Sequence, residues 1–288
     1  MSKEVQNVVS FSGGRTSAYL AHLIEKKRKA GEINNVHYVF MDTGAEHPKT
    51  YEFIRNCVSY FGIELTCLRA VMSEEKGVGV TYRELPLSEC GSDLQPWKDM
   101  LRCYSTPYIR GAMCTRAMKT DPYEKWCKAK FGKGNWVSWL GMRIDEKTRL
   151  KPRKGIRYLA EISPMDKLDI LGFWKDMPFD LGIDEWVGNC VFCIKKGINK
   201  VALAAIDAPE LARQFQDMLD TAPIRIIETR EDAPEIMYRG HHSFRSLKAT
   251  YADFTREDIL TGMRGNSGGC TESCEVFGCQ GDLFDDNQ

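Results

Sequence analysis

The chain has 288 residues, enough for one large domain or two smaller ones with a sizeable core. Forty Lys and Arg residues balance forty Asp and Glu residues, which excludes a protein-wide basic footprint for nucleic acid but allows a local basic patch. No apolar run reaches the about 18 residues of a membrane span, and the first residues lack the apolar core of a signal peptide. We therefore expect a cytoplasmic protein without a membrane partner, whose eleven cysteines are reduced.

Residues 8–20, VVSFSGGRTSAYL, predict a buried strand, a turn of small and hydroxyl residues, and a helix. Such a turn can bind an anion, because glycine lets backbone N–H groups approach a phosphate and the helix N-terminus adds partial positive charge. The local sequence fits equally well an ordinary turn with a Ser or Thr N-cap. The G-x-x-x-x-G-K-S/T spacing of a Walker loop is absent. The candidate anion ligands are Ser12, Gly13, Gly14, Arg15, Thr16 and Ser17.

The next segments continue an alternation of strands and helices. Residues 36–42 and 63–70 read as strands, and a helix that begins at Pro48 lies between them. This order predicts an α/β fold with a doubly wound, mostly parallel sheet and ligands at the carboxyl ends of its strands. Asp42, Thr43 and Gly44 follow such a strand end, where Asp42 either meets a ligand or caps the next helix. Residues 71–112 show little periodicity and predict an irregular excursion beside the active site.

A cationic stretch precedes the next predicted helix. Cys114, Arg116 and Lys119 come just before a helix that Thr120 or Asp121 would cap. Positive charge at this place would lower the pKa of a thiol or hold an anion. A solvated basic turn is the alternative.

Two arginines follow the predicted strand 136–140, which ends at Gly141. Arg143 and Arg149 at a strand's carboxyl end could clamp a phosphate or sulfate bidentately. The alternative is that they form surface ion pairs with Asp145 and Glu146.

A Cys-x-x-Cys pair, Cys190 and Cys193, follows on a predicted turn. A turn points both sulfurs the same way, as a tetrahedral thiolate site requires, although the pair supplies only half of the ligands. A redox dithiol and a chance spacing are the other interpretations. The cysteines at 57, 67 and 127 lie in apolar or helical contexts and are expected in the core.

The rest of the chain is predicted to be helical, with one or two helices over 201–222 and a short one over 254–263. The adjacent His241 and His242 point in different directions and are expected on the surface or a substrate loop. The glycine-rich, acidic tail carries Cys270, Cys274 and Cys279.

Several of these segments together resemble one enzyme family. SFSGGRTSAYL is similar to the SGGxDS PP-loop of the adenine nucleotide alpha-hydrolase superfamily, with Thr16 in place of the aspartate. FMDTGAEHPKTYEF resembles the DTGxxFPETYxF signature of 3′-phosphoadenylyl sulfate (PAPS) reductases. Cys114, Lys119 and Pro122 resemble Cys-Cys-x-x-Arg-Lys-x-x-Pro of the sulfonucleotide reductases, with Thr115 replacing the second cysteine and the arginine displaced to Arg116.

Three later segments extend the resemblance. Residues 141–149 fit a version of the family's G-x-R-x-x-E-x-x-x-R segment, and residues 158–176 look like its YPLxxWTxxDVxxYI segment. The Cys-x-x-Cys pair follows Cys114 at the family's spacing. The family's closing Glu-Cys-Gly-x-His motif is missing, and Cys279 is its nearest analogue.

The resemblance implies a PP-loop nucleotide-binding domain over residues 1–188 and a C-terminal helical subdomain over 189–288 with the Cys-x-x-Cys pair and the cysteine-rich tail. It implies PAPS, or ATP with Mg²⁺, bound by the PP-loop and by Asp42, Thr43, Gly44, Arg116 and Arg149. It implies catalytic roles for Cys114, Lys119, Arg143 and Cys279. An iron–sulfur cluster of the 4Fe-4S type, or zinc, would be held by Cys103, Cys114, Cys190 and Cys193.

Three functions follow from these expectations. In the first, a cysteine thiolate reduces PAPS, and thioredoxin or glutaredoxin regenerates it. In the second, an ATP-dependent adenylating sulfurtransferase uses an iron–sulfur cluster. In the third, a non-catalytic nucleotide-binding module contains a structural zinc. We further expect a homo-oligomer, and nucleic acid as a partner only if it is a substrate for modification.

One geometric prediction concerns charge. Arg15, Arg116, Lys119 and Arg143 each lie near a predicted strand end or helix start. We expect at least three of them to approach one pocket beside Ser12 and Asp42, because strand ends converge in a doubly wound fold.

Overall fold

The computed structural model describes residues 4–75, 77–109, 111–230 and 233–263. Within them a six-stranded sheet has the order β4-β3-β2-β1-β5-β6. The strands are β1 (Gln6–Ser10), β2 (Val36–Met41), β3 (Leu65–Met72), β4 (Val80–Leu85), β5 (Trp136–Leu140) and β6 (Ile156–Tyr158). All neighbouring pairs are parallel except β3–β4. This confirms the predicted doubly wound, mostly parallel α/β sheet, in which strand order reverses on either side of β1.

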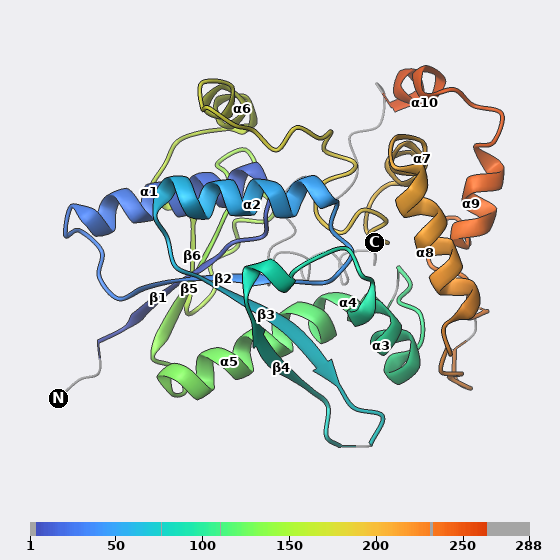
Figure 1. Ribbon diagram of the computed structural model, residues 1–288, viewed down its shortest axis with the longest axis horizontal. Helices are drawn as coiled ribbons and strands as arrows, with labels where there is room; N and C mark the ends of the chain where they lie inside the picture. Colours follow the sequence, from blue (N-terminus) through green and yellow to red (C-terminus); the bar gives the residue numbers. More distant parts are fainter. Residues whose placement is uncertain (1–3, 76, 110, 231–232, 264–288) are drawn as a thin grey trace.

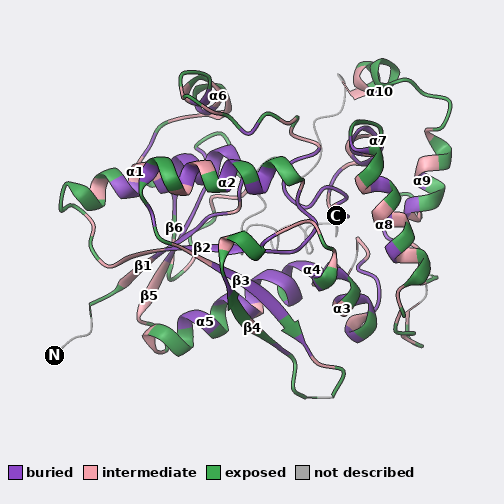
Figure 2. Cartoon of the chain, viewed as in Figure 1, coloured by how far each residue is buried: buried purple, intermediate pink, exposed green. Residues whose placement is uncertain are grey.

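Helices cover both faces of this sheet (Figure 1). Helices α1 (Arg15–Lys29), α2 (Pro48–Phe61) and α6 (Lys167–Lys175) lie on one face, and α5 (Asp121–Phe131) lies on the other. Side chains alternate between the faces along each strand. Val9 therefore packs in the core under α1 and α2, whereas Val8 packs against α5. The strands buried on both faces read as continuous apolar runs, and Figure 2 shows the buried centre of the fold.

The segment between β3 and α5 is more regular than predicted. Instead of an irregular excursion, it contains β4, a short 3₁₀ turn (Leu87–Glu89) and α3 (Gln95–Tyr104). β4 is an edge strand with exposed polar residues, so it lacks a long apolar run that a sequence could reveal. Helix α3 begins with Pro96 in its first turn and buries Trp97.

The cationic stretch is also helical, which corrects the predicted capping by Thr120 or Asp121. Helix α4 (Met113–Thr115) continues through a π-helical turn (Arg116–Thr120) directly into α5. Thr120 has the helical φ of −65°, so no new helix starts there. Turns of the π-helical type occur frequently at functional sites.

The C-terminal helices are α7 (Ile198–Asp207), α8 (Pro209–Thr221), α9 (Phe244–Thr250) and α10 (Arg256–Met263), preceded by a 3₁₀ turn (Leu159–Glu161) next to β6. Trp97 of α3 shares one hydrophobic core with Phe192, Phe215 and Phe244 from this part of the chain. The boundary after residue 188 stays a prediction, since this core joins both sides of it. None of the described helices is long and apolar enough to cross a membrane.

Candidate active site

The PP-loop connects β1 to α1 at the carboxyl edge of the sheet. The Ser12 hydroxyl donates to Ser17 Oγ at 3.0 Å, and the Ser17 hydroxyl lies 3.0 Å from its acceptor, the Gly14 carbonyl oxygen. Gly14 is the N-cap of α1, and within the described residues it has no side-chain capping bond. The alternative of a Ser or Thr N-cap is therefore wrong, and the first-turn N–H groups of α1 are suited to an external anion.

Gly13 brings this loop close to α2. Its φ is +82°, which L side chains rarely adopt, and an added Cβ would lie 2.7 Å from Thr50 Cγ2. Glycine is required here by both the backbone and the packing.

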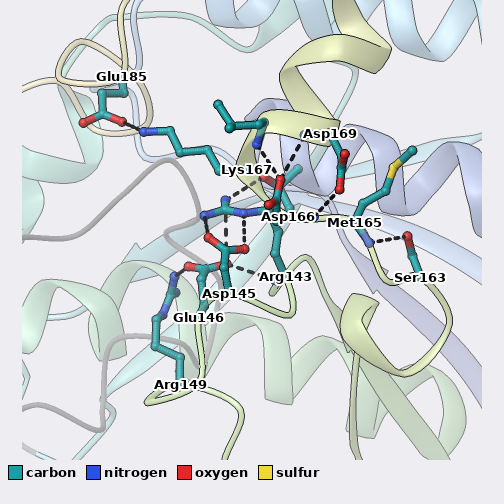
Figure 3. Close-up of polar contacts among 12 residues, drawn as sticks. Arg143, Asp145, Glu146, Arg149, Ser163, Met165, Asp166, Lys167, Asp169 and Glu185 are labelled. Carbon is teal, nitrogen blue, oxygen red and sulfur yellow. Dashed lines mark hydrogen bonds and ion pairs between the residues drawn. The ribbon is translucent and has the colours of Figure 1, made fainter.

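Arg143 reaches the PP-loop from the segment after β5, because β5 is the neighbour of β1. Its Nη1 donates to Thr16 Oγ1 at 3.2 Å, and its Nε and Nη2 donate to the two carboxylate oxygens of Asp145 at 2.9 and 3.0 Å. Burial raises the pKa of Asp145, but the hydrogen bonds and charge of Arg143 outweigh it and hold that pKa below its ordinary value. Glu146 accepts a hydrogen bond from the Arg143 backbone N–H at 3.0 Å and another from Arg149 (Figure 3).

Arg15, the first residue of α1, forms an ion pair with Asp180. Its guanidinium donates two hydrogen bonds of 2.7 Å to the carboxylate of Asp180, which follows α6. The pair ties the start of α1 to the segment that leads to the Cys-x-x-Cys pair.

Asp42 organises the segment after β2. Its Oδ1 accepts from the Tyr51 hydroxyl at 2.9 Å and from the Gly44 N–H at 3.0 Å, and Oδ2 accepts from Arg69. Asp42 is fully buried, so the Arg69 guanidinium offsets the cost of its charge. Thr43 donates to Glu46 Oε1 at 2.6 Å, and this links the segment to the thiols described next.

Glu46 is a buried carboxyl that sequence reasoning missed. Burial and the charge of Asp42 raise its pKa, whereas Lys119 and hydrogen bonds from Thr43 and Tyr51 act in the opposite direction. A glutamate just before Pro48 reads as an ordinary helix start, so only the fold reveals it.

The Cys-x-x-Cys turn lies against the segment after β2. The Val191 N–H donates to the Ala45 carbonyl at 2.9 Å, and Glu46 and Cys190 form a β-bridge. Burial, the neighbouring Cys193 and Glu46 raise the pKa of the Cys190 thiol well above its ordinary value. Cys190 is buried, while Cys193 is half-buried.

A buried lysine holds this turn in shape. The Lys196 ammonium donates to four backbone carbonyls at 2.6 to 3.1 Å. They belong to Trp186, Gly188, Cys190 and Val191. The sequence shows Lys196 only as one of two adjacent lysines after the pair, so its buried role had no sequence signal.

Tyr238 shares one hydrophobic core with three of the predicted cysteines, Cys114, Cys190 and Cys193. Tyr238 donates to the Phe192 carbonyl at 2.9 Å. Its pKa is raised by burial and then by the charges of Cys190, Cys193 and Cys114. Lys119 is buried and acts electrostatically on both Glu46 and Cys190.

Other predicted residues lie elsewhere. The Arg116 side chain is 65% exposed and its Nε lies 3.7 Å from Asp121. Cys103 lies on α3 beside Arg102 and lines a surface pocket with Arg225. The pocket shared by Arg15, Arg116, Lys119 and Arg143 stays a prediction, and protein carboxylates lie near each of these cations.

The expected metal site gains no support from the residues that the structure describes. Among them, no group of three or more His, Cys, Asp or Glu side chains could hold a metal ion. The metal site of Cys103, Cys114, Cys190 and Cys193 stays a prediction, to which the described residues add no support. Cys270, Cys274 and Cys279 lie outside the described residues.

Comparison with known proteins defines the class. The family model of the phosphoadenosine phosphosulfate reductase domain matches residues 6–154. The chain is also similar to a protein of Escherichia phage lambda, the uncharacterized nin region protein ORF290. The two are 46% identical over 284 residues, which cover 96% of this chain and 97% of that protein. The chain belongs to the PAPS reductase domain family, within the PP-loop, adenine nucleotide alpha-hydrolase-like superfamily, as the sequence predicted.

Proposed function

We propose that the chain is an enzyme that binds an adenine nucleotide, PAPS or ATP, with the sulfate or terminal phosphate at the start of α1. The observation that carries this proposal is the uncapped N-terminus at Gly14, flanked by the Ser12 and Ser17 hydroxyls. Arg143 adds a cation beside Thr16. Should ATP be the substrate, Mg²⁺ would accompany it.

The thiol pair supplies the chemistry in this proposal. The Cys193 thiolate attacks the sulfate sulfur of PAPS, the bond from that sulfur to the phosphate oxygen breaks, and adenosine bisphosphate leaves with the electron pair. Cys193 then carries an S-sulfonate. Cys190 attacks the Cys193 sulfur, which forms their disulfide and releases sulfite. Thioredoxin, glutaredoxin or another dithiol reduces the disulfide.

The surroundings of the pair support these roles. Cys193 is the less buried thiol and is suited to attack first, whereas burial keeps Cys190 protonated until it reacts. Glu46 and Cys190 are neighbours through their β-bridge, which makes the Glu46 carboxylate the candidate acceptor of the Cys190 proton, and the charge of Lys119 acts to lower the pKa of both groups. Cys114 provides a third thiol in the hydrophobic core that contains Tyr238.

The second candidate is an ATP-dependent adenylating sulfurtransferase. The loop's Ser-Gly-Gly with following hydroxyls, Thr16 and Ser17, favours it. We derive no step through an iron–sulfur cluster, because the described residues do not group three ligands. The same observation gives no support to a module built around a structural zinc.

Products distinguish these functions. Reduced protein is incubated with PAPS and thioredoxin, or with ATP and Mg²⁺. Sulfite and adenosine bisphosphate indicate the reductase, and AMP with pyrophosphate indicates adenylation. Cys193→Ser should abolish sulfite release, whereas Cys127→Ala, a change in the core under α5, should retain it. If the protein neither binds nor turns over PAPS or ATP, the proposal is wrong.

A further inference from the structure

Positive charge is concentrated in one part of this neutral chain. Residues 125–157 contain eleven Lys and Arg residues against two Asp and Glu residues, whereas the rest of the chain contains 29 against 38. The densest segment is residues 147–157, which we name the basic loop. It carries six cations and no carboxylate: Lys147, Arg149, Lys151, Arg153, Lys154 and Arg157.

The basic loop presents much of this charge to solvent. Lys147, Lys151, Lys154 and Arg157 are exposed, and Arg149 and Arg153 are half-buried. Arg157 pairs with Glu161 and stacks over the Trp139 ring. Solvated cations on a loop are common, so charge alone does not indicate a partner.

The basic loop lies next to the candidate active site, and this position indicates a functional role. It starts beside the candidate active site, because Arg149 bonds Glu146, which in turn bonds the backbone of Arg143 at the PP-loop (Figure 3). It then runs back along the sheet edge, and Gly155 accepts a hydrogen bond from the Ser138 N–H at 2.8 Å. The basic loop thus joins the carboxyl end of β5 to the start of β6, the last strand of the described sheet.

A second set of exposed cations precedes β5 in the sequence. Gly155 lies close to Trp136: a Cβ added to Gly155 would be 3.9 Å from the Trp136 carbonyl oxygen. The four lysines at 125, 128, 130 and 133, on α5 and in the turn before Trp136, are all exposed. These lysines precede Trp136 in the chain and add to the positive charge of residues 125–157.

We propose that the basic loop is a docking surface for the phosphodiester backbone of a nucleic acid, which lies beside the nucleotide site. A mononucleotide places its charge at one point and is accommodated at the PP-loop, whereas a row of exposed cations matches a polyanion with repeating phosphates. This inference adds a partner and rests on the proposed function only in taking the PP-loop as the active site.

Binding of a fluorescein-labelled oligonucleotide of about 30 nucleotides tests the proposal, followed by anisotropy from about 50 to about 200 mM salt. Single-stranded DNA, its duplex and the RNA of the same sequence form separate arms. We expect one of them to bind more tightly than poly-glutamate of equal charge. The triple variant Lys147→Ala, Lys151→Ala, Lys154→Ala should weaken binding on the order of 100-fold and reduce the salt slope by about two to three.

The matched control removes three exposed cations that lie outside residues 125–157, on α3, α8 and α9: Lys98→Ala, Arg213→Ala, Arg245→Ala. It should bind the oligonucleotide as the wild type does. The proposal is overturned if both triple variants lose the same amount of oligonucleotide affinity. It is also overturned if the wild type binds poly-glutamate as tightly as it binds each oligonucleotide. Titration of PAPS and ATP in parallel distinguishes failure of the docking surface from failure of the proposed nucleotide-binding function. Wild-type protein that binds a nucleotide but no oligonucleotide refutes only the docking surface, and the reverse result refutes the proposed function.

Discussion

The PP-loop should depend on Gly13 for two separable reasons. Gly13→Ala places a Cβ 2.7 Å from Thr50 Cγ2 and 3.0 Å from Ile54 Cδ1, on a backbone with φ +82°. Both neighbours are buried β-branched residues of α2, so neither can easily move aside. Gly31 offers a matched control at the other end of α1, with φ +74° and nothing within 4 Å of an added Cβ.

The loss of stability in Gly13→Ala has two parts, backbone strain and overpacking. A left-handed φ costs about 1–3 kcal/mol for a residue with a Cβ, and overpacking a core adds about 1–3 kcal/mol. Gly31→Ala should therefore lower the free energy of unfolding by only the first amount, and Gly13→Ala by roughly 2–6 kcal/mol. Urea unfolding measures both, and the gain from restricting the unfolded chain is common to them and cancels in the comparison.

A double-mutant cycle tests the steric part. Thr50→Ser removes the clashing methyl group, so in the Gly13→Ala background it should recover part of the stability, with a coupling of about 0.5–3 kcal/mol. Equal destabilisation by Gly13→Ala and Gly31→Ala, together with no coupling to Thr50, would refute the packing account of the loop.

Three further predictions concern charge and thiols. Lys196→Met should lower the free energy of unfolding by about 3 kcal/mol or more, since it removes the donor that four backbone carbonyls share; the urea midpoint measures it. Burial opposes the ionisation of Glu185, but its hydrogen bonds and charge interactions with Lys167 and Lys200 outweigh burial and lower the pKa from 4.5 to about 2. Its stabilisation is therefore present above pH 4.5 and lost as pH falls toward 2, and Glu185→Gln should flatten the stability profile in that window. At about pH 8, iodoacetamide should modify Cys193 before Cys190, whose pKa burial raises, and peptide mass spectrometry would show the order.

The sequence predicted the elements whose pattern is local. Buried parallel strands such as β1 and β2 are continuous apolar runs, and Pro48 marks the start of α2, so the doubly wound sheet could be inferred. The β4 strand could not, because its polar, exposed residues give an edge strand no apolar signal. The start of α5 was misplaced because Pro122 in its first turn resembles a helix start, although the chain is already helical from Met113.

The candidate site was predictable only in part, because much of it depends on pairs distant in the sequence. The PP-loop and the Cys-x-x-Cys pair are compact motifs and could be found directly. The partner of Arg15 is Asp180, and the bond from Val191 to Ala45 joins the thiol turn to the segment after β2. No local pattern carries such contacts. Glu46 likewise becomes a candidate only when the fold buries it near Lys119.

Nucleotide binding by Gly14→Val tests the central claim most directly. Gly14 has φ −89° and ψ 161°, which valine adopts readily, so the backbone permits the substitution. Its side chain would nevertheless occupy the approach of an anion to the start of α1. Calorimetric titration with PAPS and with ATP should show binding to the wild type and none to the variant, and circular dichroism checks that the variant is folded. Unchanged affinity of a folded Gly14→Val variant would contradict the assignment of the PP-loop as the anion site.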